Sequence, residues 1–266
     1  MIQFNIHRFG KVARWSLTND KSYYMRTLLQ MFVLLTLMFL FFTTSFYWLK
    51  GADTGYKPCC VVVVMMFFFQ IAVGPSMMFN SMKGKHDRQT LLLLPASNFE
   101  KYLMRYATWI FVMGIIVVAF LGADLVQYVF NWLIGNNPQF VTGALFSRLN
   151  PFTVNWEAIG SKKVTVINAL IIMFLWLQSC FALGATFFRS HKYSWIFTLL
   201  VLIFLSMVQT WLFPISYENQ FDMIHGDAMT LLYISDAVYG IWAIVNYWLS
   251  YKIFCRTQNI GKFVNI

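Results

Sequence analysis

The amino-acid sequence predicts an all-α membrane protein that crosses the bilayer six times. Hydrophobic residues make up 59% of its 266 residues, whereas charged residues make up only 11%, against about 25% in an ordinary soluble domain. Six long apolar segments each approach or exceed the roughly 20 residues that a helix needs to cross a hydrocarbon core. This composition excludes a soluble globular enzyme, a disordered chain and a disulfide-stabilised secreted module.

The six spans form one membrane domain, residues 28–250. They are expected at residues 28–49, 59–79, 106–127, 164–188, 194–213 and 231–250. The second apolar run opens after Pro58, and Pro214 ends the fifth. Gly74-Pro75 predicts a kink near the end of the second span, because proline removes a backbone hydrogen bond. Helices are expected throughout, since an isolated strand cannot satisfy its backbone in lipid.

The positions of Lys and Arg predict the orientation. Fifteen of the 20 lie before the first span, after the last, or in the second and fourth connections, and residues 214–230 hold none. Basic residues collect on the cytoplasmic side of membrane proteins. We therefore expect both termini in the cytoplasm of a bacterial inner membrane. We attribute the net charge of +10 to basic residues that orient the chain in the bilayer, and we expect no nucleic-acid partner.

Two basic segments flank the membrane domain, the leader 1–27 and the tail 251–266. The leader is too long and too polar before its first apolar run to be a cleavable signal. Within residues 6–16, Ile6, Phe9 and Ala13 share one face at helical spacing. This pattern predicts an amphipathic helix in the inner membrane interface. A solvated basic leader is an equally good reading.

Sequence motifs for chemistry are absent. There is no phosphate-binding loop ending in Gly-Lys-Ser/Thr and no His-Glu-x-x-His. The four cysteines lack metal-ligand spacing, and no histidine falls within a predicted span. We expect no catalytic, cofactor-binding or metal-binding residue in this chain, and no enzymatic activity of its own.

Two acids fall inside predicted spans, Asp124 in the third and Asp236 in the sixth. An ionisable residue at membrane depth is a functional candidate by default. The favoured alternative is that each lies in the wet outer interface or caps a helix, because neither is near the midplane. Polar residues such as Gln178 and Asn246 are expected to join helices rather than line a transport path.

The connection between the second and third spans contains the most informative motif. Asp87 can cap a short helix over residues 88–94, which Pro95 ends. Ser97 and Glu100 have capping-box spacing and predict the start of the next helix. The short helix is rich in leucine and preceded by bases; it packs on lipid or docks a soluble partner. Its candidate docking residues are Lys85, Asp87, Arg88, Leu91, Leu92 and Pro95.

The run Arg88-Gln-Thr-Leu-Leu-Leu-Leu-Pro-Ala-Ser-Asn-Phe-Glu-Lys101 resembles the segment after the second span in permease subunits of exporter-type ABC transporters, especially the Bacteroidetes versions. The six spans, the basic leader and the basic tail extend the resemblance loosely over the whole chain. One departure is that the longest outer connection follows the third span, at residues 128–163, whereas many relatives elaborate the region before the sixth.

The resemblance implies a permease subunit of an ATP-driven exporter. Two permease copies, identical or sister chains, would form the translocation path, and a separate ABC ATPase subunit would bind and use the ATP. The segment 83–95 would be the coupling helix that docks on the ATPase. A small secondary carrier and a membrane scaffold or assembly protein without transport activity remain alternatives.

Overall fold

The computed structural model describes residues 4–50, 52–80, 90–91, 93–136, 138–149, 163–188, 193–212 and 228–256. Within these ranges the chain is helical and contains no β-strand. It divides into two compact units, each described by itself below. Unit 1 comprises Met1–Val12, Ile71–Ala107 and Ser161–Ile266, and unit 2 comprises Ala13–Gln70 and Thr108–Gly160.

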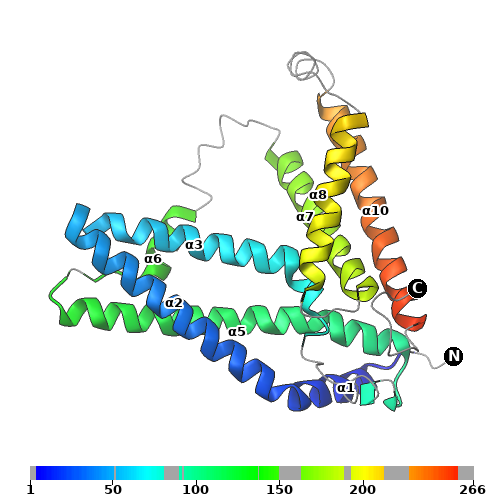
Figure 1. Ribbon diagram of the computed structural model, residues 1–266, viewed down its shortest axis with the longest axis horizontal. Helices are drawn as coiled ribbons and strands as arrows, with labels where there is room; N and C mark the ends of the chain where they lie inside the picture. The colour runs from blue at the N-terminus through cyan, green and yellow to red at the C-terminus, as the bar shows by residue number, and fades with distance from the viewer. Residues whose placement is uncertain are drawn as a thin grey trace. The chain divides into compact units, whose positions relative to one another are not determined.

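The helices follow the chain in the order shown in Figure 1. They are α1 (Ile6–Asn19), α2 (Lys21–Lys50), α3 (Ala52–Val73), the 3₁₀ helix η1 (Gly74–Met77), α5 (Asn98–Leu133), α6 (Val141–Leu149), α7 (Lys163–Phe187), α8 (Ser194–Leu212) and α10 (Ala228–Arg256). Helix α6 was not predicted. The backbone tightens to η1 where Gly74-Pro75 predicted a kink, and Pro75 lies at the start of that 3₁₀ turn.

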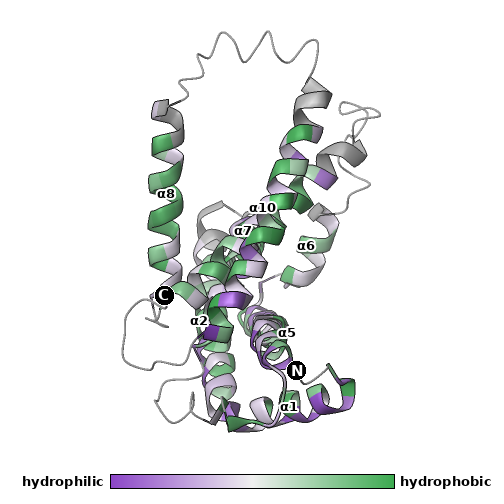
Figure 2. Cartoon of the chain, turned by 90° about the vertical axis from the view of Figure 1, so that its right-hand side faces the viewer, coloured by the Kyte–Doolittle hydropathy of each residue, from purple (hydrophilic) through white to green (hydrophobic). Residues whose placement is uncertain are grey.

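Four of the described helices are long and apolar enough to cross a membrane. These stretches are Lys21–Ser45, Gly55–Met77, Asn98–Leu133 and Asn168–Phe187, and α8 adds a shorter apolar stretch, Ser194–Val208. Figure 2 shows hydrophobic residues along α8 and hydrophilic residues gathered on α1. The chain therefore has the helices of a membrane protein.

The helix bounds differ from the predicted spans chiefly at their polar ends. The second span was expected to open after Pro58, but α3 begins at Ala52 and includes Pro58. Helix α5 has 36 residues and is therefore about 54 Å long, longer than a hydrocarbon core of about 30 Å. Hydropathy marks only the apolar part of such a helix, which explains why the prediction stopped short at both ends.

Unit 2 is built around α2, most of α3, the greater part of α5, and α6. Its core consists of buried apolar residues from all four helices: Leu35, Phe39, Tyr56, Cys59, Cys60, Val63, Ala119, Phe120, Ala123 and Val141. Gly55 lets α3 approach α2 closely, because a Cβ there would lie 2.9 Å from the carbonyl oxygen of Phe42. Small residues at such crossings are typical of packed membrane helices.

Unit 1 is built around α7, which packs against α10, α8 and η1. Two buried apolar clusters hold it together, one formed by Ala72, Val73 and Phe181 and the other by Met78, Ala182 and Ala185. Gly184 on α7 faces Thr198 on α8 so closely that a Cβ at Gly184 would lie 1.8 Å from Thr198 Oγ1. The absence of a side chain at Gly184 is therefore what permits this crossing.

Candidate functional site

The predicted coupling segment is only partly described. Lys85, Asp87, Arg88 and Leu92 lie outside the described residues. Residues 90, 91 and 93 are helical, and a bend at 94–96 contains the exposed Pro95. Leu91, expected to anchor a partner, is only 3% exposed, whereas Leu93 is 81% exposed. Between these two described leucines, Leu93 is the one available for docking, because Leu91 is already packed within the protein.

The bend leads directly into the start of α5, where Ser97 and Glu100 hydrogen-bond to each other. The Glu100 backbone N–H donates to Ser97 Oγ at 3.2 Å, and the Ser97 N–H donates to Glu100 Oε2 at 2.9 Å. This reciprocal pair has the geometry of a capping box. It satisfies two backbone donors that the first turn of a helix otherwise leaves without partners.

Glu100 also holds the N-terminal segment in place. Arg8 donates to its two carboxylate oxygens from Nε and Nη2, both at 2.7 Å, and the Asn5 N–H donates to Oε1 at 2.8 Å. The Glu100 side chain is fully covered, although that of Arg8 stays 28% exposed. Glu100 precedes the span predicted at residues 106–127, so the pair lies at the polar end of α5.

These contacts shift the titration of both partners. The hydrogen bond from Arg8 lowers the pKa of Glu100 to about 2, opposed by desolvation and assisted by the N–H groups of Asn5 and Ser97. The hydrogen bond to Glu100 also raises the pKa of Arg8. Glu100 is therefore a carboxylate at neutral pH, and the charge-assisted bonds keep α1 attached to the capping box.

Aromatic packing reinforces the same junction, which we call the leader junction (residues 4–8, 97–102 and 251–254). The Phe4 and Phe99 ring centroids are 6.0 Å apart, and Phe99 meets Tyr251 of α10 at 5.9 Å. Tyr102 contacts both Tyr251 and Phe254, at 5.7 and 5.6 Å. The leader junction therefore joins the N-terminal segment, the start of α5 and the end of α10 within unit 1.

Asp124, the first of the two acids within predicted spans, caps helix α6. Its carboxylate accepts the Val141 N–H at 2.8 Å and the Thr142 N–H at 2.9 Å, and also accepts the Thr142 hydroxyl. Gln127 donates to it at 3.0 Å, and the side chain is only 2% exposed. A negative charge at a helix N-terminus is stabilising, so the arrangement around Asp124 is that of a structural cap.

The Asp124 cap belongs to a larger buried polar network in unit 2. Gln127 Nε2 also donates to the Gln139 carbonyl at 2.9 Å, and Asn131 Nδ2 donates to Thr43 Oγ1 of α2 at 3.0 Å. The Gln139 N–H donates to the Tyr56 hydroxyl of α3 at 3.0 Å. The network fixes the connection after α5 to its neighbouring helices. Asp236 belongs to unit 1, is partly buried, and does not enter this network.

Polar side chains on α10 make a second set of interhelical contacts, in unit 1. Asn246 donates to Ser179 Oγ of α7 at 3.1 Å, and Ser250 donates to the Ala182 carbonyl of α7 at 3.1 Å. The Tyr247 and Tyr106 hydroxyls share a hydrogen bond of 3.0 Å. On the other side of α7, Gln178 donates to the Ile71 carbonyl at 2.8 Å. Gln178 and Asn246 thus join helices in the described structure.

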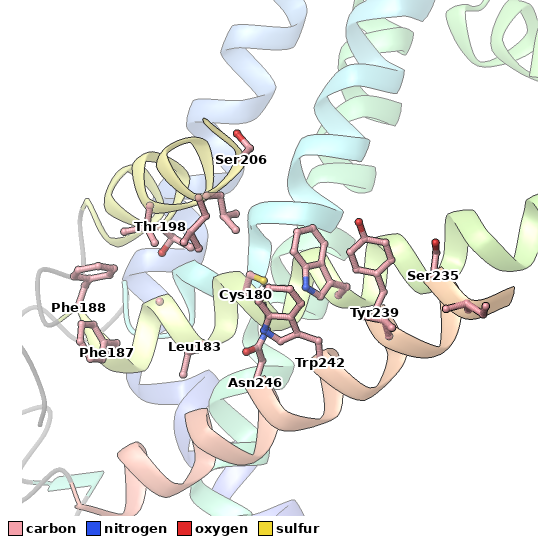
Figure 3. Close-up of a pocket in the computed structure, with 17 residues that line it drawn as sticks. Cys180, Leu183, Phe187, Phe188, Thr198, Ser206, Ser235, Tyr239, Trp242 and Asn246 are labelled. Carbon is pink, nitrogen blue, oxygen red and sulfur yellow. Dashed lines mark hydrogen bonds between the residues drawn. The ribbon is translucent and has the colours of Figure 1, made fainter. Parts of the chain in front are cut away.

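A cavity of about 640 Å³ lies among α7, α8 and α10. Figure 3 shows Cys180 and Leu183 of α7, Thr198 of α8, and Trp242 of α10 around it. The residues that line it are Trp176, Cys180, Leu183, Gly184, Phe187, Phe188, Thr198, Val201, Leu202, Leu205, Ser206, Ile234, Ser235, Val238, Tyr239, Trp242 and Asn246. None of these described lining residues is charged. Its size falls in the usual range for small-molecule sites, about 300–1,000 Å³.

Three aromatic side chains form one wall of the cavity. The Trp176 ring lies 5.1 Å from Tyr239 and 5.9 Å from Trp242, measured between centroids. The indole nitrogen of Trp176 is buried, and no residue in the described part of the chain accepts its hydrogen bond. The sequence analysis missed this site. One usable signal was the position of Trp176 in the middle of an apolar run, since tryptophan prefers the membrane interfaces.

Comparison with protein-family models, curated proteins and solved structures gave no match to this chain. The leader junction and the cavity therefore carry the functional argument by themselves.

Proposed function

We propose that this chain is the membrane-spanning permease subunit of an ATP-driven exporter. A second permease copy, identical or sister, completes the translocation path, and a separate ABC ATPase subunit supplies the energy. Both termini and the segment 83–95 face the cytoplasm of a bacterial inner membrane, and the chain crosses it six times. Transport then follows from rearrangement of helices rather than from chemistry in this polypeptide.

The observation that carries this proposal is the exposed Leu93, a few residues before the leader junction. A partner that drives helix movement needs an apolar anchor and a stiff connection from that anchor to the spans. Leu93 is 81% exposed, and it is followed within a few residues by the capped start of the 36-residue helix α5. The Glu100 carboxylate stabilises that start by accepting hydrogen bonds from the Ser97 N–H and from the Arg8 guanidinium. A movement that a partner imposes at residue 93 would therefore be transmitted through the short bend at 94–96 to helix α5.

Affinity purification in mild detergent tests the partner. The wild-type chain should copurify an ATPase that contains a phosphate-binding loop. Leu93→Asp should lose it, because truncating an interface anchor typically costs over about 2 kcal/mol, which is roughly 30-fold in affinity. Leu93 is the test position because a substitution at the buried Leu91 would also disturb the fold.

The matched control is Phe146→Asp on α6. Phe146 is an apolar side chain of similar exposure, 72%, in the connection expected on the outer face. This variant should insert normally and keep the ATPase. If Leu93→Asp inserts normally and still copurifies the ATPase in wild-type amount, Leu93 is not the docking residue.

Cysteine labelling tests the six spans and their orientation. On a background without native cysteines, an impermeant reagent added from outside should modify a probe cysteine at position 219 and spare one at position 85. The reason is the excess of basic residues on one set of connections. Labelling in the opposite pattern would overturn the topology.

A further inference from the structure

Helix α1 (Ile6–Asn19) carries a stripe of exposed bases. His7, Lys11 and Arg14 are all exposed, and their spacing of four and three residues places them within about 60° of one another around the helix axis. The helix contains no acidic residue, and neither Lys11 nor Arg14 forms an ion pair with another described residue. This positive side of α1 is therefore open to a negatively charged partner from outside the chain.

A second exposed stripe on α1 is apolar and runs beside the bases. Ile6 is 70% exposed and Leu17 is 40% exposed, and Gly10 lies between them on the same side at helical spacing. This apolar side is centred about 100° from the bases around the helix axis. Val12 and Ser16 lie on the remaining side and are buried. The helix therefore has one packed side, one exposed apolar side and one exposed basic side.

These three sides match the conditions at the surface of a bilayer. Helix α1 ends at Asn19, and the apolar stretch of the next helix, α2, begins at Lys21, so α1 ends where a membrane helix starts. An amphipathic helix in that interface buries its apolar side among acyl chains and keeps its bases near the headgroups. An acidic protein surface would neutralise the bases, but it does not explain an exposed apolar side next to a membrane helix.

We propose that α1 binds anionic phospholipids of the bilayer. Its apolar side lies among their acyl chains, and Lys11 and Arg14 contact their negatively charged headgroups. Arg8 has a different role, because its guanidinium already bonds the Glu100 carboxylate at 2.7 Å and so holds the helix to the protein. Binding of lipid requires no ATPase, so the proposal is tested separately from the exporter function.

Selective quenching of fluorescence tests which lipid lies beside α1. The full-length protein, with its native cysteines replaced and a fluorescent label on Gly10→Cys, is placed in nanodiscs of equal parts phosphatidylcholine and phosphatidylglycerol. Gly10 is exposed, and nothing lies within 4 Å of an added Cβ, so the label can be accommodated. In one sample only phosphatidylglycerol carries brominated acyl chains, which quench a nearby label, and in the other only phosphatidylcholine does. Phosphatidylglycerol should be enriched beside the label about fivefold for each base that its headgroup contacts.

Removing the bases tests their role in this preference. In the double variant Lys11→Gln and Arg14→Gln, the two brominated lipids should quench the label equally. Lys57→Gln is the control, because Lys57 is an exposed base on α3, and this variant should keep the preference. A label on Leu37→Cys, at a 63% exposed residue in the apolar stretch of α2, should be quenched equally by both lipids. All variants should elute as folded protein in size-exclusion chromatography.

Three results would overturn the proposal. Absence of quenching at Gly10→Cys by either lipid would mean that α1 faces water or an acidic protein. Equal quenching by both lipids, without the double substitution, would mean that α1 lies on the bilayer but does not select anionic headgroups. A preference that persists in full in the folded double variant would mean that Lys11 and Arg14 do not contact the headgroups.

Discussion

Arg8 and Glu100 are 92 residues apart in the sequence, yet two hydrogen bonds of 2.7 Å join the guanidinium of one to the carboxylate of the other. The same carboxylate completes the capping box of α5 through Ser97. One side chain therefore fixes both the start of a membrane helix and the position of the N-terminal segment. The predicted interfacial leader is, in this structure, tied to α5 by specific polar bonds as well as by apolar contacts.

Arg8→Ala should release the N-terminal segment without disturbing the rest of unit 1. The variant loses both bonds from Arg8 to Glu100, whereas the capping box keeps its own two bonds. Hydrogen exchange followed by mass spectrometry should show faster exchange in residues 4–9 and little change in α7. Arg26→Ala is the control, since Arg26 is an exposed base on the next helix, α2. Equal exchange in both variants would show that the ion pair does not hold the segment.

Acid should release the same segment within a defined pH range. The pKa of Glu100 is lowered to about 2 from an ordinary value of 4.5 by its bond from Arg8. A carboxyl group whose pKa is lowered by folding stabilises the folded form at pH values above its ordinary pKa. That stabilisation is lost as the pH falls from 4.5 towards 2. Protection of residues 4–9 from hydrogen exchange, corrected for intrinsic rates, should decline over this range.

Glu100→Gln supplies the comparison for the acid experiment. Glutamine carries no charge at any pH, so the segment should already be less protected at neutral pH. Its protection should then change much less between pH 4.5 and 2. A wild-type decline that persists in full in the Gln variant would assign the acid sensitivity to other carboxylates.

Gly184→Ala should destabilise the packing of α8 on α7. A Cβ at this position would lie 1.8 Å from Thr198 Oγ1 and 2.9 Å from Thr198 Cβ, so one helix must shift. Such overpacking typically costs about 1–3 kcal/mol, measurable by denaturation in detergent. Gly114→Ala is the control, because nothing lies within 4 Å of its added Cβ. Removing a helical glycine there should stabilise by about 0.5–1 kcal/mol.

Asp124→Ala should destabilise α6 specifically. The Val141 and Thr142 N–H groups would lose their acceptor in a buried setting, at a cost of roughly 2–4 kcal/mol for the two. Hydrogen exchange of residues 141–149 should accelerate first. Asp236→Ala, at the more exposed acid, should change stability by less than about 0.5 kcal/mol. A larger effect at Asp236 than at Asp124 would contradict the assignment of Asp124 as the cap.

Local patterns predicted the positions of the long helices, because apolar length and local caps are encoded in neighbouring residues. The nine-residue helix α6 could not be predicted in the same way, since its cap, Asp124, lies 17 residues before Val141. Pro58 misled the prediction of the start of α3, because proline is disfavoured inside a helix, yet α3 begins at Ala52 and continues through Pro58. The cavity was inaccessible to sequence reasoning, since it depends on how α7, α8 and α10 pack together.

The polar residues of α10 also have a consequence for how this helix can move. For a helix in lipid, as we propose α10 to be, the hydrocarbon surroundings favour no particular apolar face, so apolar contacts alone leave its rotation weakly determined. Asn246, Tyr247 and Ser250 remove that freedom, because turning α10 about its axis would separate them from Ser179, Tyr106 and Ala182. Hydrogen bonds from its own side chains therefore hold helix α10 against rotation about its axis.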